Sequence, residues 1–496
     1  MNRPNIILIM TDQQRFDTVG AWGNDHMITP NIDKLVRNGT SFAQSYCPGA
    51  TCVASRAAIF TGMYPHTTGV YSFQNWANHR CWVQDLADAG YVCANIGKMH
   101  FSPRDVPGGF HDRIIVENPT NRTHATGGAD DDWGKYMTLH GITRPNERNQ
   151  TDPEWLKKFQ GVVWHEEERF HSDVFIGNSA VRWIETNQSG KPLFLEVGFT
   201  GPHEPWDPLQ RHFDMYDDRE VPPRIMRKGE LDEKPPQHLA HQHFHANTGH
   251  ESQIDIASAG EDDIARMRRH YYAKITTVDE QVGRVMDALE ARGYLDNSIV
   301  IFCSDHGELL GDHQLAYKWL MYDPIVHIPL IVRTTGSVNN PGKVTDLVSL
   351  MDLGPTILEA AGVDVPTYME GRSLRPYFEG EPIEPRKFVC CEDNYQVMFR
   401  TESHKLVYYI GQKAGELYDL TDDPDELWNR WDSPDYATVK QELLIHVLDW
   451  MASSNYWNSG YKREAGRQYT MRWPTPDDAG LHGAGKNEKG RPLGYL

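Results

Sequence analysis

Residues 6–12 read Ile-Ile-Leu-Ile-Met-Thr-Asp, an unbroken apolar run that ends in two polar residues. A strand that is apolar at every position must be covered on both faces, which is typical of a central strand in a parallel sheet. Asp12 then lies at the carboxyl end of the strand, and ligands bind at this edge of open α/β sheets. The stretch therefore predicts an α/β fold with Asp12 at its functional edge.

Further apolar runs, with helical patterns between them, extend this sheet. The runs predict strands at 91–96, 192–199, 298–303 and 328–333. The helical patterns fall at 32–37, 83–89, 173–187, 262–292 and 353–361. This alternation predicts a large central sheet, mixed but mostly parallel, flanked by helices.

We expect the chain to divide into three parts. Residues 1–375 form the α/β domain, and short alternating runs predict a smaller antiparallel sheet with a C-terminal helix at 376–452. Residues 453–496 lack periodicity and are either an oligomerisation arm or a disordered tail. Within the first part, the stretches 102–168 and 205–260 have no sustained period, so we expect irregular surface excursions there.

Composition and charge exclude several classes of partner. The 496 residues carry a formal net charge of −20, which argues against nucleic acid. No apolar run is long enough for a signal-peptide core or a bilayer span, so we expect no membrane association. The seven cysteines, which include the adjacent Cys390 and Cys391, suit a reducing compartment. We therefore expect a cytoplasmic protein, and a homo-oligomer if the arm contacts a second copy.

Residues 47–62 read as a loop followed by a helix, with Cys52 near the helix N-terminus and Arg56 one turn further on. Backbone N–H groups and the helix dipole favour an anion at such a place, which predicts a lowered pKa for the Cys52 thiol. Taken alone, a Cys-x-x-x-Arg pattern is more often a half-buried cysteine beside a surface arginine. The Cys-x-x-x-Arg pattern therefore indicates a functional site only when other motifs of the chain accompany it.

Other strand ends also carry side chains that could act chemically. These are Lys98 and His100 after the second strand, His203 after the third, and Asp305 and His306 after the fourth. Two carboxylates and an imidazole make a reasonable divalent metal site. Each residue is weak evidence alone, because an aspartate after a strand commonly caps a turn or helix, and Lys318 could be a solvated helix lysine.

Together these motifs resemble the type I sulfatases of the alkaline phosphatase superfamily, in order and over roughly residues 4–450. The motifs that carry the resemblance are Asp12, Cys52-Val53-Ala54-Ser55-Arg56 with Thr61-Gly62, Gly97-Lys98-Met99-His100, Pro202-His203, Asp305-His306-Gly307, Lys318, and Gly415-Glu416-Leu417-Tyr418-Asp419-Leu420 with Asp423-Pro424. The resemblance implies an alkaline phosphatase-like fold. It also implies hydrolysis of small-molecule sulfate monoesters, aryl or alkyl.

In that family the motif cysteine is converted to formylglycine, whose hydrate carries two hydroxyls on one carbon. A formylglycine-generating or equivalent maturation enzyme is therefore an implied partner. By resemblance, one divalent metal ion, Ca²⁺ or Mn²⁺, is held by Asp12, Asp305, His306 and the modified Cys52. The resemblance assigns the remaining roles as follows: Asp305 accepts the proton of the attacking hydroxyl, His203 or Lys318 assists the departing alcohol, His100 deprotonates the second hydroxyl, and Arg56 and Lys98 balance the anionic oxygens.

The chain departs from the family pattern at three positions. Gln13 stands where many members carry a second aspartate, and its amide oxygen could coordinate a metal but brings no charge. His306 replaces a common asparagine, and imidazole suits manganese, zinc or iron better than calcium. Ala54 replaces a frequent proline, which bears on the efficiency of Cys52 conversion.

Two alternative functions stay open. Asp12-Gln13 and Asp305-His306 also resemble the phosphonate monoester hydrolases, which would make the chain a phosphonate monoester or phosphate diester hydrolase with the same nucleophile. Lys98 and His100 favour the sulfatase reading. The other alternative is a non-catalytic metal- and anion-binding protein in which Cys52 stays a thiol.

The alcohol half of the substrate is not specified by these motifs. The two excursions contain four tryptophans, Trp133, Trp155, Trp164 and Trp206, which we expect to shape its pocket. Their aromatic faces could enclose a cation such as choline, or they could simply pack in the core.

Overall fold

The computed structural model describes residues 3–76, 79–118, 131–144, 157–247, 253–335 and 342–458. At its centre lies a sheet of eight strands in the order β4-β3-β5-β1-β6-β7-β2-β8. Their bounds are β1 Asn5–Asp12, β2 Thr40–Tyr46, β3 Val92–Gly97, β4 Asp112–Ile115, β5 Leu193–Pro202, β6 Ser298–Ser304, β7 Leu330–Thr334 and β8 Lys343–Ser349. β7 is antiparallel to both its neighbours and the other pairings are parallel. The predicted mixed, mostly parallel sheet is confirmed.

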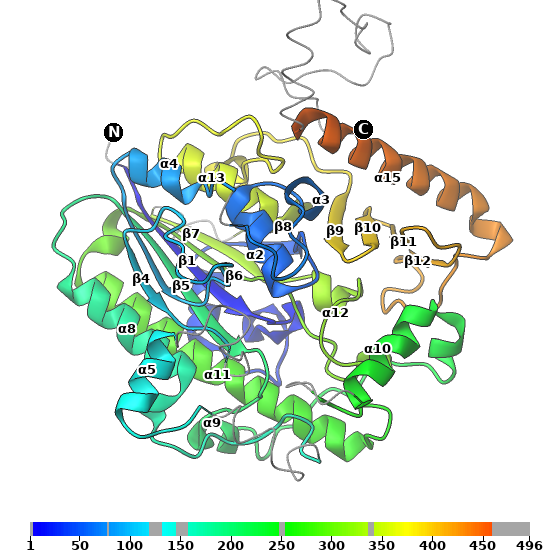
Figure 1. Cartoon of the computed structure of the whole chain (residues 1–496), viewed down its shortest axis with the longest axis horizontal. Coiled ribbons are helices and arrows are strands. Elements are labelled where there is room, and N and C mark those ends of the chain that lie inside the picture. Colours follow the sequence, from blue (N-terminus) through cyan, green and yellow to red (C-terminus); the bar gives the residue numbers. More distant parts are fainter. Residues whose placement is uncertain are drawn as a thin grey trace, which may run out of the picture.

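Helices cover both faces of this sheet because the apolar side chains of β1 alternate between them. Ile6, Leu8 and Met10 pack with one group of helices, whereas Ile7 and Ile9 pack with the other. The first group includes α2 Cys52–Thr61, α4 Val83–Asp88 and α13 Leu353–Ala360; the second includes α1 Pro30–Arg37, α5 Asp132–Leu139, α8 Ser172–Thr186 and α11 Glu261–Ala291 (Figure 1). The remaining α-helices are α3 Pro65–Thr68, α9 Gln210–Asp214, α10 Pro236–Asn247, α12 Asp323–Val326, α14 Arg375–Glu379 and α15 Ala437–Asn458.

A second, antiparallel sheet follows, as predicted, in the order β12-β11-β10-β9. Its strands are β9 Val389–Asp393, β10 Gln396–Arg400, β11 His404–Tyr409 and β12 Gly415–Asp419, and α15 lies along one side of them (Figure 1). The end of β9 reaches the loop before α2: Glu392 N donates to Pro48 O at 3.0 Å, and Ala50 N donates to Glu392 O at 3.3 Å. The small sheet therefore supports the segment that leads into Cys52.

Some sequence predictions were wrong in detail. The stretch 102–168 contains β4 and α5, and the stretch 205–260 contains α9 and α10, so neither is irregular throughout. β2 and β8 were not predicted. α15 continues to Asn458, past the predicted boundary at 452, and the rest of the predicted arm or tail lies outside the described residues. Within the described ranges, no helix combines the length and apolarity needed to cross a bilayer.

Candidate active site

Cys52, which was predicted to lie near a helix N-terminus, is the first residue of α2, and the whole helix is buried. The chain can reach this position because Gly49 lacks a side chain; a Cβ there would lie 2.7 Å from the backbone nitrogen of Ser55. α2 ends at Gly62, which adopts a left-handed conformation with φ of 73° that glycine tolerates best. Local sequence thus fixes both ends of the helix that presents Cys52.

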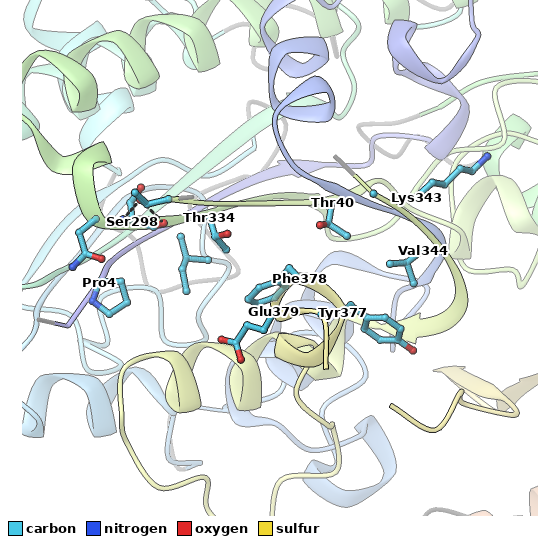
Figure 2. A pocket seen from close by; sticks show the side chains of 14 residues that line it. Pro4, Thr40, Ser298, Thr334, Lys343, Val344, Tyr377, Phe378 and Glu379 are labelled. Atoms are coloured by element: carbon cyan, nitrogen blue, oxygen red, sulfur yellow. Dashed lines mark hydrogen bonds between the residues drawn. The ribbon is translucent and has the colours of Figure 1, made fainter. Parts of the chain in front are cut away.

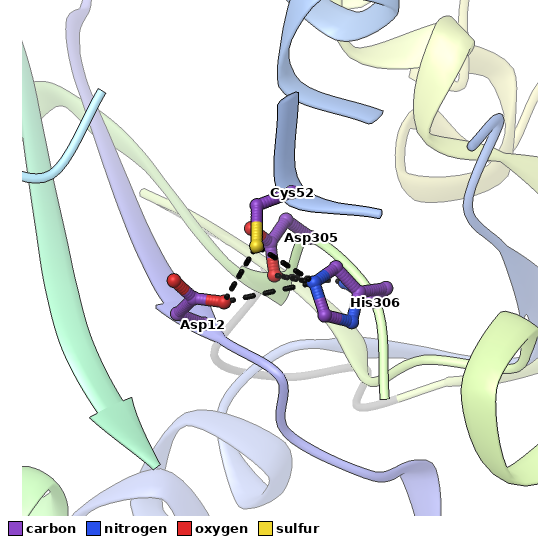
Figure 3. Close-up of side chains that lie close together, drawn as sticks. All are labelled: Asp12, Cys52, Asp305 and His306. Carbon is purple, nitrogen blue, oxygen red and sulfur yellow. Dashed lines mark hydrogen bonds and ion pairs between the residues drawn. The ribbon is translucent and has the colours of Figure 1, made fainter. Parts of the chain in front are cut away.

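Four predicted residues meet in one buried cluster. Figure 3 shows Asp12 from the end of β1, Cys52 from α2, and Asp305 and His306 directly after β6, with one potential ligand atom from each lying within 4.8 Å of the others. Cys52 Sγ is 3.2 Å from His306 Nε2 and 3.6 Å from Asp12 Oδ1. His306 Nε2 lies 3.7 Å from Asp12 Oδ1 and 3.8 Å from Asp305 Oδ1. The set of donors is one that a divalent metal can use.

Each carboxylate in the cluster has one oxygen held by a cation. Asp12 Oδ2 accepts a hydrogen bond from the Lys98 ammonium, and Asp305 Oδ2 accepts one from Arg56 Nε at 2.8 Å. Arg56 also donates through Nη1 to the carbonyl of Lys98 at 2.9 Å. Although burial opposes it, the Arg56 guanidinium holds the pKa of Asp305 well below its ordinary range. Asp12 Oδ1 faces Cys52 and His306, whereas Asp305 Oδ1 faces the imidazole of His306 and accepts hydrogen bonds from the backbone N–H groups of Gln13 and His306.

The orientation of His306 also fits a metal ligand. Its Nδ1 lies 2.9 Å from the carbonyl of Gly307, which can only accept, so Nδ1 carries the proton. The lone pair of Nε2 then faces the cluster. This is the usual arrangement of a metal-binding histidine, in which the second nitrogen donates to a carbonyl or carboxylate.

The predicted lowering of the Cys52 pKa is wrong. Burial raises the pKa of the thiol to about 11, and the nearby Lys318 ammonium offsets this only in part. The helix N-terminus is a partial charge, whereas removal from water penalises a full thiolate charge. Cys52 as a cysteine is therefore a neutral thiol at physiological pH.

Lys318 is a buried member of the site and lies outside any helix. Its Nζ is 3.3 Å from Cys52 Sγ and also donates to Gln13 Oε1. On its other side, the Gln13 amide donates through Nε2 to Glu204 Oε2 at 2.9 Å and to Glu308. The amide oxygen of Gln13 is thus directed at Lys318.

His100 and His203 follow β3 and β5 at the same edge of the sheet. Burial, together with the charges of Lys98 and Arg56, holds the pKa of His100 well below its usual range. Burial and the charge of Lys318 do the same for His203. Both imidazoles are therefore neutral near pH 7. Burial also lowers the pKa of Lys98, to about 7.

Sequence reasoning missed two acidic residues of the site. Glu204 and Glu308 are buried and hold the Gln13 amide; the available signal was their position directly after His203 and Gly307 at two strand ends. Trp133, Trp164 and Trp206 pack in hydrophobic cores, which is the second of the two roles that the sequence left open for them. Trp155 lies outside the described residues.

A separate cavity of about 690 Å³ lies at the opposite edge of the large sheet. Figure 2 shows Pro4, Ser298 and Lys343 among its lining residues, which precede or begin β1, β6 and β8. It shares no residue with the cluster around Cys52.

Comparisons with known proteins agree with this geometry. Residues 4–363 match the sulfatase family, and residues 311–452 match the family described as N-sulphoglucosamine sulphohydrolase, C-terminal. An arylsulfatase from Clostridium perfringens (strain 13 / Type A) is 29% identical over 477 residues, covering 90% of this chain and 95% of the relative. A choline-sulfatase from Rhizobium meliloti (strain 1021) is 28% identical over 472 residues, covering 91% of this chain and 86% of the relative.

Among solved structures, the phosphonate monoester hydrolase of Agrobacterium radiobacter matches with a TM-score of 0.77 at 24% identity, covering 91% of this chain and 96% of that chain. This likeness shows the shared fold. The family match spans most of the chain and includes every residue of the cluster. The chain therefore belongs to the sulfatase family and is a sulfuric ester hydrolase.

Proposed function

We propose that the chain hydrolyses aryl or alkyl sulfate monoesters to an alcohol and sulfate, with a nucleophile made from Cys52 beside a bound divalent metal. The observation that carries the proposal is the buried meeting of Cys52 with Asp12, Asp305 and His306 within 4.8 Å. A thiol whose pKa is raised to about 11 is a poor nucleophile near pH 7. Conversion of Cys52 to formylglycine by a maturation enzyme would supply an oxygen nucleophile and a second hydroxyl on the same carbon for release of the sulfate ester.

The metal would be held by Asp12, Asp305, His306 and the modified Cys52. Bound there, a divalent ion lowers the pKa of a hydroxyl and neutralises sulfate oxygens. The Nε2 lone pair of His306 faces the cluster, and a nitrogen donor favours Mn²⁺ over Ca²⁺. Gln13 is the less suitable ligand because its amide oxygen accepts a hydrogen bond from Lys318.

Three buried basic side chains would balance the charge of the sulfate in a protein whose net charge is −20, with Lys98, whose pKa is lowered to about 7, acting in its protonated form. They are Arg56, Lys98 and Lys318. Arg56 has a donor to spare, because its Nη2 is buried and has no hydrogen-bond partner among the described residues. A buried, unpaired donor of this kind is suited to an anionic oxygen. In the attack on sulfur, Asp305 would accept the proton of the nucleophilic hydroxyl, whose own pKa the bound metal lowers.

Departure of the alcohol needs a proton or a positive charge. Lys318 supplies it best, because its ammonium lies 3.3 Å from Cys52 Sγ. His203 has a depressed pKa and so is not protonated near pH 7. His100 is neutral for the same reason, which suits a group that accepts a proton from the second hydroxyl when the ester is released.

A second candidate function is hydrolysis of phosphonate monoesters or phosphate diesters with the same nucleophile. The pairs Asp12-Gln13 and Asp305-His306 support it. A relative named multifunctional alkaline phosphatase superfamily protein PehA, from Trinickia caryophylli, is 27% identical over 499 residues. A site that stabilises a tetrahedral anionic centre can act on esters of both sulfur and phosphorus, so side activity on phosphorus esters is expected.

The experiment that ranks these functions is a comparison of kcat/KM on matched 4-nitrophenyl sulfate and 4-nitrophenyl phosphonate esters, on protein of known metal content. The leaving group is the same in both, so the ratio reports the preference for sulfur or phosphorus. We expect the sulfate to be preferred. A large preference for the phosphonate would reverse the ranking, and a Cys52 that stays an unmodified thiol in protein from a host with the converting enzyme would support the non-catalytic alternative.

Two further expectations accompany this function. All seven cysteines lie in the described ranges as free thiols, which is in keeping with the predicted cytoplasmic location. Assembly into a homo-oligomer stays a prediction, to be tested by light scattering.

A further inference from the structure

Lys318 is carried by a loop with an unusual backbone. Tyr317 and Trp319, on either side of it, have φ of 69° and 73°. Leu310, His313 and Gln314 earlier in the same loop also have positive φ. Non-glycine residues rarely adopt this conformation, and clusters of it persist only where surrounding contacts impose it. The loop therefore does not place Lys318 by its own preference.

Side chains from two distant elements form hydrogen bonds with the backbone carbonyl groups of Lys318 and Trp319. His241 of α10 has its Nε2 2.9 Å from the carbonyl oxygen of Lys318, and Gln396 of β10 donates through Nε2 to the carbonyl oxygen of Trp319 at 3.0 Å. Trp319 N donates in turn to Ala50 O at 3.2 Å, in the loop that leads to Cys52. The same short segment is thus tied to α10, to the small C-terminal sheet and to the Cys52 loop.

The contact of His241 is a hydrogen bond with a defined direction. A carbonyl oxygen can only accept, so Nε2 of His241 carries the proton and donates. The neighbouring His245, one helical turn further along α10, stacks on the Trp319 ring with centroids 5.2 Å apart. α10 itself is anchored, since Gln242 Nε2 donates to Gln314 O at 2.8 Å and His238 Nε2 lies 3.5 Å from Glu416 Oε2. The helix can therefore act as a fixed support for the loop.

We propose that His241 and Gln396 are positioning residues for Lys318: their hydrogen bonds to the carbonyls of Lys318 and Trp319 hold the left-handed loop in the one conformation that places the Lys318 ammonium beside Cys52. In this arrangement α10 and the C-terminal sheet serve the reaction without touching the substrate. The inference rests on the proposed function, in which Lys318 assists the departing alcohol. A small shift of such a group is costly to catalysis, about 10²-fold for a displacement of about 1 Å.

The test uses the dependence of rate on the leaving group. Phenyl sulfate has a poorer leaving group than 4-nitrophenyl sulfate and needs more assistance, so the ratio of their kcat/KM values reports the placement of Lys318. His241→Phe keeps an aromatic ring but removes the donor. His241→Gln removes the ring but keeps a donor at a similar distance from the backbone. His243→Phe makes the same histidine-to-phenylalanine substitution at an exposed position of the same helix and serves as the matched control.

We expect His241→Phe and Gln396→Leu to raise the 4-nitrophenyl to phenyl ratio about tenfold or more, in the same direction as Lys318→Ala. His241→Gln and His243→Phe are expected to keep the wild-type ratio. The inference is overturned if Lys318→Ala raises the ratio while His241→Phe and Gln396→Leu do not, or if His241→Gln raises it as much as His241→Phe. If Lys318→Ala itself leaves the ratio unchanged, the role of Lys318 in the proposed function fails, and the positioning role with it.

Discussion

Arg56 Nε lies 2.8 Å from Asp305 Oδ2, and neither side chain is exposed to solvent. This ion pair joins α2 to the residue that follows β6. One contact therefore fixes the helix that carries Cys52 relative to Asp305, a predicted metal ligand. Because a buried ion pair is costly to break, each partner fixes the other. The Lys98 carbonyl accepts a second hydrogen bond from the same guanidinium.

Arg56→Lys is therefore expected to lower kcat/KM by about 10²-fold or more, because a lysine cannot make the two directed hydrogen bonds of a guanidinium fork. Steady-state kinetics with 4-nitrophenyl sulfate measures the effect. Arg37→Lys, at the end of α1 and away from the cluster, is the control that should retain activity. An active Arg56→Lys enzyme would show that charge alone suffices at this position.

The metal preference is expected to depend on His306. His306→Asn replaces the nitrogen donor by an amide oxygen, so the variant should bind less Mn²⁺ relative to Ca²⁺ than the wild-type protein does. Both proteins are dialysed against equal concentrations of the two ions, and bound metal is measured by elemental analysis. His243→Asn, an exposed histidine, controls for the substitution itself. An unchanged ratio of the two metals would remove His306 from the ligand set.

Gly97 links the fold to the site, because it precedes Lys98 at the end of β3. It adopts φ of 115°, and a Cβ added there would overlap the carbonyl oxygen of Gly198 in β5. Gly97→Ala should therefore destabilise the protein by more than ~2 kcal/mol and displace Lys98. Gly90 has φ of 94° with nothing within 4 Å of the added carbon, so Gly90→Ala isolates the cost of the backbone conformation, about 1 kcal/mol.

Urea unfolding of both glycine variants measures the difference. Equal destabilisation by the two substitutions would mean that the β3–β5 contact at Gly97 relaxes freely.

How much of this arrangement could be foreseen depends on the range of the interactions. The strand ends that carry Asp12, Lys98, His203 and Asp305 follow apolar runs, and the local pattern alone places them on one edge of a parallel sheet. β2, by contrast, reads Thr-Ser-Phe-Ala-Gln-Ser-Tyr, which is neither a continuous apolar run nor a strict alternation. Its pairing is decided by β7 and β8 rather than by its own residues.

The burial of the site could also not be predicted from the local sequence. The expectation of a lowered pKa for the Cys52 thiol took only the helix N-terminus into account. Desolvation by segments distant in the chain instead raises that pKa. In the same way, nothing in the sequence around Lys318 indicates that His241 and Gln396 hold its backbone, because those contacts join three elements far apart in the chain.

Acid sensitivity is expected to depend on Glu416, which connects α10 to the C-terminal sheet. Burial opposes ionisation, but His238 and Lys234 and the hydroxyl of Tyr409 lower the pKa of Glu416 to about 2, from an ordinary value of 4.5. A depressed carboxyl pKa stabilises the fold above pH 4.5, and this contribution is lost as the pH falls from 4.5 towards 2. It amounts to about 3 kcal/mol at most.

Glu416→Gln should remove this pH dependence. The free energy of unfolding of the wild type and the variant is measured at several pH values between about 6 and 3, with the exposed Glu442→Gln as the control. The gap between wild type and Glu416→Gln should narrow as the pH falls. A gap that is constant with pH would contradict the assigned pKa.

The nucleophile is the central claim, and mass spectrometry of the peptide that contains Cys52 tests it most directly. The protein is produced in a host that has the converting enzyme, and the fraction of Cys52 converted is compared with the specific activity of the same preparation. We predict that the peptide carries the mass of formylglycine and that activity rises in proportion to the converted fraction, with Cys52→Ala folded and inactive. Full sulfatase activity in a preparation whose Cys52 is entirely an unmodified thiol would contradict the account.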